Sequence, residues 1–133
     1  DALKKSAMVF CSMDAGTAGT FKQVKGVDGY ERVSENLREY AKYGPVVLKY
    51  ILMDGVNDKP EDLDGFFALA DEIAARVVLN RDYTDLNHAF SDRALRFAAK
   101  FIAHFRKQGK IDVAASFARP GEKERLNNLL EEI

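Results

Sequence analysis

VVLKYILMDGVNDKPEDLDGFFALADEIAARVVLN, residues 46–80, decides the fold class of this chain. The run 46–53 is almost continuously apolar and rich in β-branched and aromatic residues, which is typical of a strand covered on both faces. Residues 58–74 repeat apolar side chains at helical spacing, with a proline in the first turn and a capping box that would begin at Asp58. Residues 76–80 form a second β-branched run. This order predicts a βαβ unit with parallel strands.

The same alternation continues on both sides of this unit. Further strands are expected over residues 7–12 and 111–115, and further helices over 30–43, capped by Asp28, over 91–107 and from 126 to 133. Units of about 30 to 35 residues suit βαβ construction, and three or four of them make half of an eightfold barrel. We therefore predict an α/β fold, a partial (half) TIM-like barrel of three to four parallel strands with alternating helices, as a single domain over residues 1–133.

Composition limits the partners and the compartment. The 133 residues carry 20 Lys and Arg against 21 Asp and Glu, so no large single-signed field attracts nucleic acid or an anionic membrane surface. The longest apolar runs are far shorter than the roughly 20 residues that span a bilayer. We expect neither nucleic acid nor a membrane as a partner. Cys11 is the single cysteine, which favours a reducing compartment, the cytoplasm.

Candidate functional residues follow from the predicted sheet. In barrels and in open α/β sheets, functional groups gather at the carboxyl ends of the parallel strands. The residues selected by this rule follow the strands predicted at 7–12, 46–53 and 76–80, and they are Ser12, Asp14, Gly16, Thr17, Asp54, Asn57, Asp58, Asn80, Asp82 and Asp85.

Two of these strand ends resemble the radical S-adenosylmethionine enzymes. FCSMDAGT, residues 10–17, followed by TFKQVKG, residues 20–26, is similar to the family's fourth-strand signature, in which a strand ends in Ser-x-Asp and leads into a short helix that closes on glycine. VLKYILMDGVND, residues 47–58, is similar to the family's fifth strand and the loop after it. The two segments occur in the family's order, and the resemblance covers residues 6–80.

The resemblance implies a partial barrel that binds S-adenosylmethionine across its open top and cleaves it reductively to a 5′-deoxyadenosyl radical. By position, Ser12 would face the methionyl or ribose end of the cofactor, with Asp14 nearby. Lys49 would meet a carboxylate of the cofactor or of the substrate. Residues 78–80, which end in Asn80, would lie beside the adenine.

The chain departs from the family at the iron–sulfur cluster. In the family, a Cys-x3-Cys-x2-Cys loop after the first strand supplies the three thiolates of a [4Fe-4S] cluster, and this chain has only Cys11, inside a strand. The chain also begins at Asp1 without an initiator methionine, as if mid-protein. We therefore expect S-adenosylmethionine and the cluster in the parent protein but neither bound to this chain, and no catalytic or metal-ligating residue here. The expected partner is the missing N-terminal half of the same protein.

Each candidate also has a simpler interpretation. Cys11 would be a small buried hydrophobe, Ser12 and Asp14 would cap the next helix, and Lys49 would reach water from an edge strand. Asp82, Asp85 and His88 invite a metal hypothesis, but their spacing matches no strong signature; His104 is expected at the surface, and Phe97, Phe101 and Phe105 in the core.

Two other functions stay open. The chain could be a non-catalytic α/β interaction or binding module that has lost the cluster, or a fragment of an aldolase-like α/β barrel, for which Lys49 lies inside its strand rather than at the end. A truncated barrel has an open sheet edge and an exposed inner face, so we also expect self-association of the isolated chain.

Overall fold

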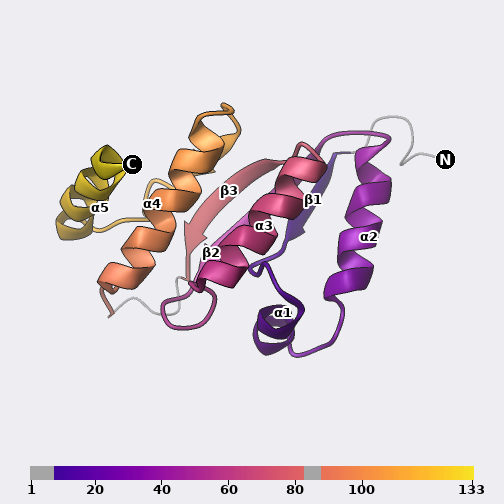
Figure 1. Cartoon of the computed structure of the whole chain (residues 1–133), viewed down its shortest axis with the longest axis horizontal. Coiled ribbons are helices and arrows are strands. Elements are labelled where there is room, and N and C mark those ends of the chain that lie inside the picture. Colours follow the sequence, from indigo (N-terminus) through magenta and orange to yellow (C-terminus); the bar gives the residue numbers. More distant parts are fainter. Residues whose placement is uncertain (1–7, 83–87) are drawn as a thin grey trace.

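A computed structural model of the chain describes residues 8–82 and 88–133, and within them four parallel strands form one sheet (Figure 1). The strands lie in the sheet in sequence order: β1 (Val9–Ser12), β2 (Val46–Leu52), β3 (Arg76–Arg81) and β4 (Ile111–Val113). The helices are α1 (Ala18–Lys25), α2 (Tyr30–Ala41), α3 (Pro60–Glu72), α4 (Asp92–Arg106) and α5 (Pro120–Glu132). The predicted α/β fold with a parallel sheet and alternating helices is confirmed.

The two faces of the sheet have different surroundings. Figure 1 shows α2, α3 and α4 on the same side of the sheet. Along β2 the even-numbered residues are buried, whereas Val47, Lys49 and Ile51 between them are half-buried. The prediction that this strand is covered on both faces is therefore wrong for the described residues, because α2, α3 and α4 lie on one side and the side chains of the other face are only half-buried. By strand alternation, the opposite face, which we call the helix-free face, carries Phe10, Ser12, Val47, Lys49, Ile51, Val78 and Asn80.

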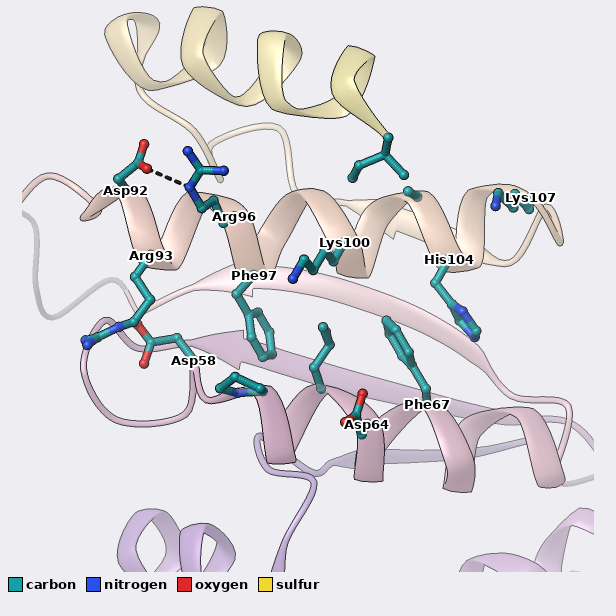
Figure 2. A pocket seen from close by; sticks show the side chains of 14 residues that line it. Asp58, Asp64, Phe67, Asp92, Arg93, Arg96, Phe97, Lys100, His104 and Lys107 are labelled. Atoms are coloured by element: carbon teal, nitrogen blue, oxygen red, sulfur yellow. Dashed lines mark hydrogen bonds and ion pairs between the residues drawn. The ribbon is translucent and has the colours of Figure 1, made fainter.

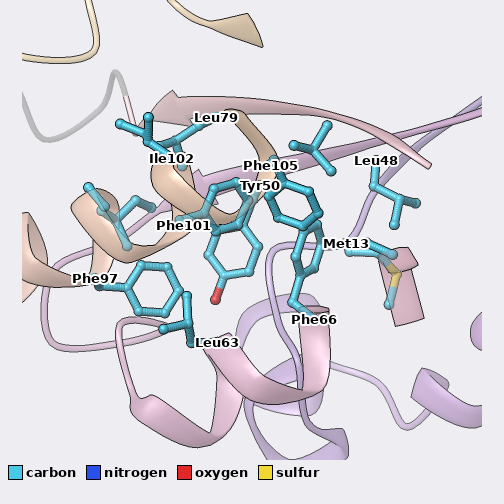
Figure 3. Packing of buried hydrophobic residues seen from close by; sticks show 14 of the residues in the cluster. Met13, Leu48, Tyr50, Leu63, Phe66, Leu79, Phe97, Phe101, Ile102 and Phe105 are labelled. Atoms are coloured by element: carbon cyan, nitrogen blue, oxygen red, sulfur yellow. The ribbon is translucent and has the colours of Figure 1, made fainter. Parts of the chain in front are cut away.

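The hydrophobic core lies between the sheet and the helix layer (Figure 3). Tyr50 meets Phe66 of α3 edge to face, with ring centroids 5.0 Å apart, and Phe66 stacks on Phe101 of α4 at 5.2 Å. Phe97 and Phe105 are also buried, which confirms the predicted aromatic stripe. Large rings from one strand and two helices therefore bind the layers together, because buried aromatic pairs add specific contacts to their large apolar area.

The helix starts differ from the sequence prediction. Neither Asp28 nor Asp58 caps a helix, since α2 begins after Gly29 and α3 after Lys59, both without a side-chain cap bond. The carboxylate of Asp58 instead accepts hydrogen bonds from Gly55 N–H and from Arg93, each at 3.1 Å. Asp58 therefore bonds to Arg93 of α4 and does not form the cap of α3 that its place in the sequence predicted.

Arg81 and Glu122 join β3 to the first turn of α5. Both side chains are buried, and two guanidinium nitrogens contact the two carboxylate oxygens at 2.6 and 3.2 Å. Glu122 also accepts bonds from the backbone N–H groups of Phe90 and Arg119. The guanidinium lies 3.8 Å from the ring centroid of Phe90 and donates to the carbonyl oxygen of Phe117. This buried pair fixes α5 and the residues before α4 at the carboxyl end of β3.

The contribution of this ion pair to stability is expected to be lost in acid. Burial acts to raise the pKa of Glu122, but the hydrogen bonds from Arg81 and from two backbone N–H groups outweigh it and lower that pKa below the ordinary 4.5. The unfolded chain then binds a proton more readily, so the pair stabilises fully above pH 4.5 and less as the pH falls through the lower folded pKa. The free energy of unfolding in urea should differ between the wild type and Glu122→Gln at pH 7, and the difference should shrink towards pH 3. A difference that stays constant would contradict the assignment.

Candidate functional site

Ser12, the last residue of β1, and Lys49, in the middle of β2, lie side by side in the sheet. The strand register pairs Ser12 with Lys49, and Lys49 in turn with Val78 of β3, so the three residues form one row across the helix-free face. Because β2 lies between β1 and β3, the edge-strand interpretation of Lys49 is wrong. The lysine is half-buried and forms no ion pair with any described residue. A half-buried ammonium without a countercharge among the described residues is suited to attract an anion.

Asp14 organises the end of β1. Its carboxylate oxygen Oδ2 accepts bonds from the Ser12 hydroxyl and from the Lys25 ammonium, both at 2.8 Å, and Oδ1 accepts the Ile51 N–H at 2.6 Å. The residue is buried and has a positive φ of 57°, which is uncommon for a non-glycine residue. The helix-capping interpretation of Ser12 and Asp14 is wrong, because Thr17 accepts the Thr20 N–H and caps α1.

The loop after β1 is held by α3. The fully buried carboxylate of Asp62 accepts bonds from Gly16 N–H at 2.9 Å, from the Thr17 hydroxyl at 3.2 Å and from the Thr20 hydroxyl at 2.8 Å. Sequence reasoning missed Asp62. The sequence does contain a sign of its role, because Asp62 directly precedes Leu63 on the apolar face of the predicted helix. A carboxylate buried at such a position needs hydrogen-bond partners.

Two glycines let α3 approach this loop closely. A Cβ atom on Gly16 would lie 1.8 Å from the carbonyl oxygen of Asp62, and one on Gly65 would lie 1.8 Å from the carbonyl oxygen of Gly16. Tyr30 of α2 donates its hydroxyl to that same Gly16 oxygen at 2.9 Å. The backbones of the loop and of α3 are therefore in direct contact, which sets the position of Asp14 and Ser12 relative to β2.

Asn57 ties the loops after β1 and β2 together. Its buried side-chain amide donates to the carbonyl oxygens of Asp14 and Ile51 at 2.9 and 2.8 Å and accepts the Met53 N–H at 2.8 Å. Tyr50 adds a hydroxyl bond to the Asn57 carbonyl oxygen at 2.5 Å, and burial raises the pKa of this phenol far above its usual value. These contacts give Asn57 a structural role, because its side chain builds the turn after β2 and holds it against the loop after β1.

Asn80 shares the helix-free face with Lys49 but is not its partner in the strand register. The register places it opposite Ile51, and its side-chain oxygen accepts the N–H of Arg81 at 2.8 Å. Of the other strand-end candidates, Asp54 accepts two bonds from Ser91, at the start of α4. The structure thus brings Ser12 and Asp14, at the end of β1, next to the neighbouring strand β2 that carries Lys49, and it places Asn80 on the next strand, β3.

The described residues contain no cluster that would support the metal hypothesis for Asp82, Asp85 and His88. Asp85 lies outside them, and within residues 8–82 and 88–133 no group of three His, Cys, Asp or Glu side chains could hold a metal ion. Cys11 packs against the core, and burial, the largest influence, raises the pKa of its thiol. The thiol is therefore disfavoured as a nucleophile, in line with the interpretation of Cys11 as a buried hydrophobe.

Comparison with known proteins does not identify the chain. It gives no significant match to a protein family, to a curated protein or to a solved structure. Among the described helices, none is both long and apolar enough to cross a membrane. Function must therefore be inferred from the geometry of the motif residues, which place the Lys49 ammonium beside the Ser12 hydroxyl and the buried Asp14 carboxylate.

Proposed function

We propose that the chain belongs to a radical S-adenosylmethionine enzyme and forms the cofactor- and substrate-facing half of its partial barrel. The observation that carries the proposal is that Ser12 and Lys49, from the two resembling motifs, are adjacent in register on the helix-free face. Asp14 of the first motif bonds to Ser12 and to the backbone of β2. Motif residues separated by a whole helix therefore meet at one site.

The topology of the sheet supports a half barrel. Doubly wound sheets reverse their strand order and carry helices on both faces. Here the strand order is sequential, and α2, α3 and α4 lie on one side. A sheet wound in one direction with its helices outside is the arrangement that closes into a barrel when strands are added, and the helix-free face then becomes the interior.

The binding roles follow from the polar groups on this face. Lys49 would attract a carboxylate of S-adenosylmethionine or of the substrate, and Ser12, whose proton points to Asp14, would accept a hydrogen bond at the methionyl or ribose end. Asn80 and the backbone of residues 78–80 would lie beside the adenine. The bound cofactor and its cluster supply the radical chemistry.

The cluster ligands are not among these residues. Cys11 packs towards the helix layer, and a [4Fe-4S] cluster open to a cofactor needs three thiolates. The chain by itself would bind and orient ligands without catalysing the reaction, and the missing N-terminal half, in a reducing compartment such as the cytoplasm, would supply the cluster. The isolated chain, with an open β1 edge and Phe10 57% exposed on the helix-free face, should self-associate.

The parent protein tests the proposal directly. Its sequence upstream of Asp1 should contain three cysteines at Cys-x3-Cys-x2-Cys spacing. The whole protein, with its iron–sulfur cluster reconstituted and reduced, should cleave S-adenosylmethionine to 5′-deoxyadenosine. Lys49→Met should weaken S-adenosylmethionine binding about ten- to a hundredfold while the cluster absorbance is unchanged, because a charged hydrogen bond is lost. Lys59→Met, at an exposed position outside the site, is the matched control.

The outcome also separates the alternatives. A parent without upstream cysteines, which forms no 5′-deoxyadenosine, would refute the proposal and favour a non-catalytic binding module. The half-buried apolar residues of the helix-free face would then contact a protein partner. For an aldolase-like barrel, borohydride with a carbonyl substrate should instead trap a covalent adduct on Lys49.

A further inference from the structure

A groove between α3 and α4 lies apart from the strand-end site (Figure 2). It has a volume of about 820 Å³. Its floor is apolar and is formed by Leu63 and Phe67 of α3 together with Phe97 and Ala103 of α4. Ile133, beyond the end of α5, lines the groove as well and is 60% exposed. An open groove with an apolar floor between two helices suits a third helix, whose ridge of side chains would fill it.

The walls of the groove differ in charge. On α4, Arg93 and Arg96 are engaged with Asp58 and Asp92 of the same chain. Lys100 and Lys107 of the same wall are exposed, and neither forms an ion pair with a described residue. These two lysines are seven residues apart, which is two helical turns or about 10.5 Å along the axis.

None of the acidic groups that line the groove forms an ion pair with these lysines among the described residues. His104, between them, stacks on Phe67 at 3.8 Å between ring centroids and bonds to Asp71 of α3 at 2.8 Å. Asp71 is thereby engaged at one end of the groove. Asp64 on α3 is the remaining acidic side chain of that wall, and it pairs with neither lysine. An occupant must therefore bring acidic groups to the α4 side and tolerate Asp64 on the other.

We propose that this groove binds an amphipathic helix of a partner protein, with acidic residues at i and i+7 next to an apolar stripe at i+1, i+4 and i+8. The acidic pair matches the spacing of Lys100 and Lys107, and the stripe covers the apolar floor. A lysine at i+5 lies on the opposite flank of such a helix, towards Asp64. The proposal is independent of the function proposed for the strand ends.

A second copy of the chain fits this groove less well. In a two-fold pair in which the helices that form the groove meet each other, α3 would lie against α3 or α4 against α4 of the other copy. The first arrangement brings Asp64 towards its own counterpart, and the second does the same for Lys100 and Lys107. Like charges would meet in both, so a foreign helix with one acidic flank is the better match.

The test uses a synthetic helical peptide of about 15 residues with glutamate, leucine and lysine at these positions, which is enough to cover the groove. Fluorescence anisotropy should show saturable binding to the chain. Lys100→Glu/Lys107→Glu should weaken it about tenfold or more, and a peptide with lysine in place of both glutamates should bind this variant best. Arg32→Glu/Lys123→Glu, two exposed positions away from the groove with the same change in net charge, should bind the original peptide like the wild type.

Three results would overturn the proposal. The first is no saturable binding to a chain shown by circular dichroism to be folded. The second is equal weakening by both double variants, or equal binding of polyglutamate, which would indicate a response to net charge alone. The third is a dimer in sedimentation that Lys100→Glu/Lys107→Glu dissociates, since the groove would then be an interface between copies of this chain.

Discussion

Gly65→Ala is expected to lower the free energy of unfolding by about 3 kcal/mol or more, or to prevent folding. An added Cβ would lie 1.8 Å from the carbonyl oxygen and 2.8 Å from the carbonyl carbon of Gly16, and both are backbone atoms that no rotamer change can move. Alanine favours a helix over glycine by about 1 kcal/mol. A loss of stability in Gly65→Ala would therefore report the steric clash with Gly16 and not a change in helix propensity. Urea unfolding followed by circular dichroism gives the value.

Gly19→Ala is the matched control for this substitution. Gly19 also lies in a helix, α1, but nothing stands within 4 Å of its added Cβ, so stability should stay equal or rise by up to about 1 kcal/mol. If Gly65→Ala were as stable as Gly19→Ala, α3 could not be in direct contact with the loop after β1. The strand-end site would then be positioned by something other than the Asp62 bonds.

Arg81→Met is expected to destabilise the chain by about 3 to 5 kcal/mol, because it leaves the buried Glu122 carboxylate without its countercharge. Methionine has a similar length, so the change removes the charge and the hydrogen bonds while it retains much of the packing against Phe90. The measurement is again the free energy of unfolding, and loss of α5 docking should appear as reduced helical ellipticity before the main transition.

Two further variants separate charge from packing. Arg125→Met breaks a surface pair with Asp92, and such an exposed pair contributes little to stability because water screens both charges. Arg81→Met/Glu122→Leu removes both buried charges and should recover part of the loss, since replacing a whole buried pair costs less than removing one partner. If Arg81→Met lowered the free energy of unfolding no more than Arg125→Met does, water would have to reach the carboxylate of Glu122.

The elements that could be predicted are those set by local contacts. The apolar run of β2 and the helical spacing of α3 and α4 depend on residues within a few positions of each other, so those elements lie within two residues of their predicted bounds. The aromatic stripe on α4 was predictable for the same reason. The two helix caps were not, because Asp58 can bond locally or to Arg93, and only the folded chain brings Arg93 within reach.

The candidate site was predictable in its residue types and strand ends, but not in its contacts. Asp14, Asn57 and Asp62 form their bonds with residues up to 46 positions away, and no local pattern specifies such partners. The position of Lys49 on an inner strand depended on the strand order, which periodicity does not determine.

The sequence by itself determined the α/β class, the order of the elements and the polar residues that follow each strand, because these depend on short-range spacing. Only the tertiary structure decided that the helices cover one face of the sheet, that Ser12 and Lys49 share the other, and that Gly16 and Gly65 bring two backbones into contact. Those features depend on packing between segments that are far apart in the sequence, so no short segment specifies them.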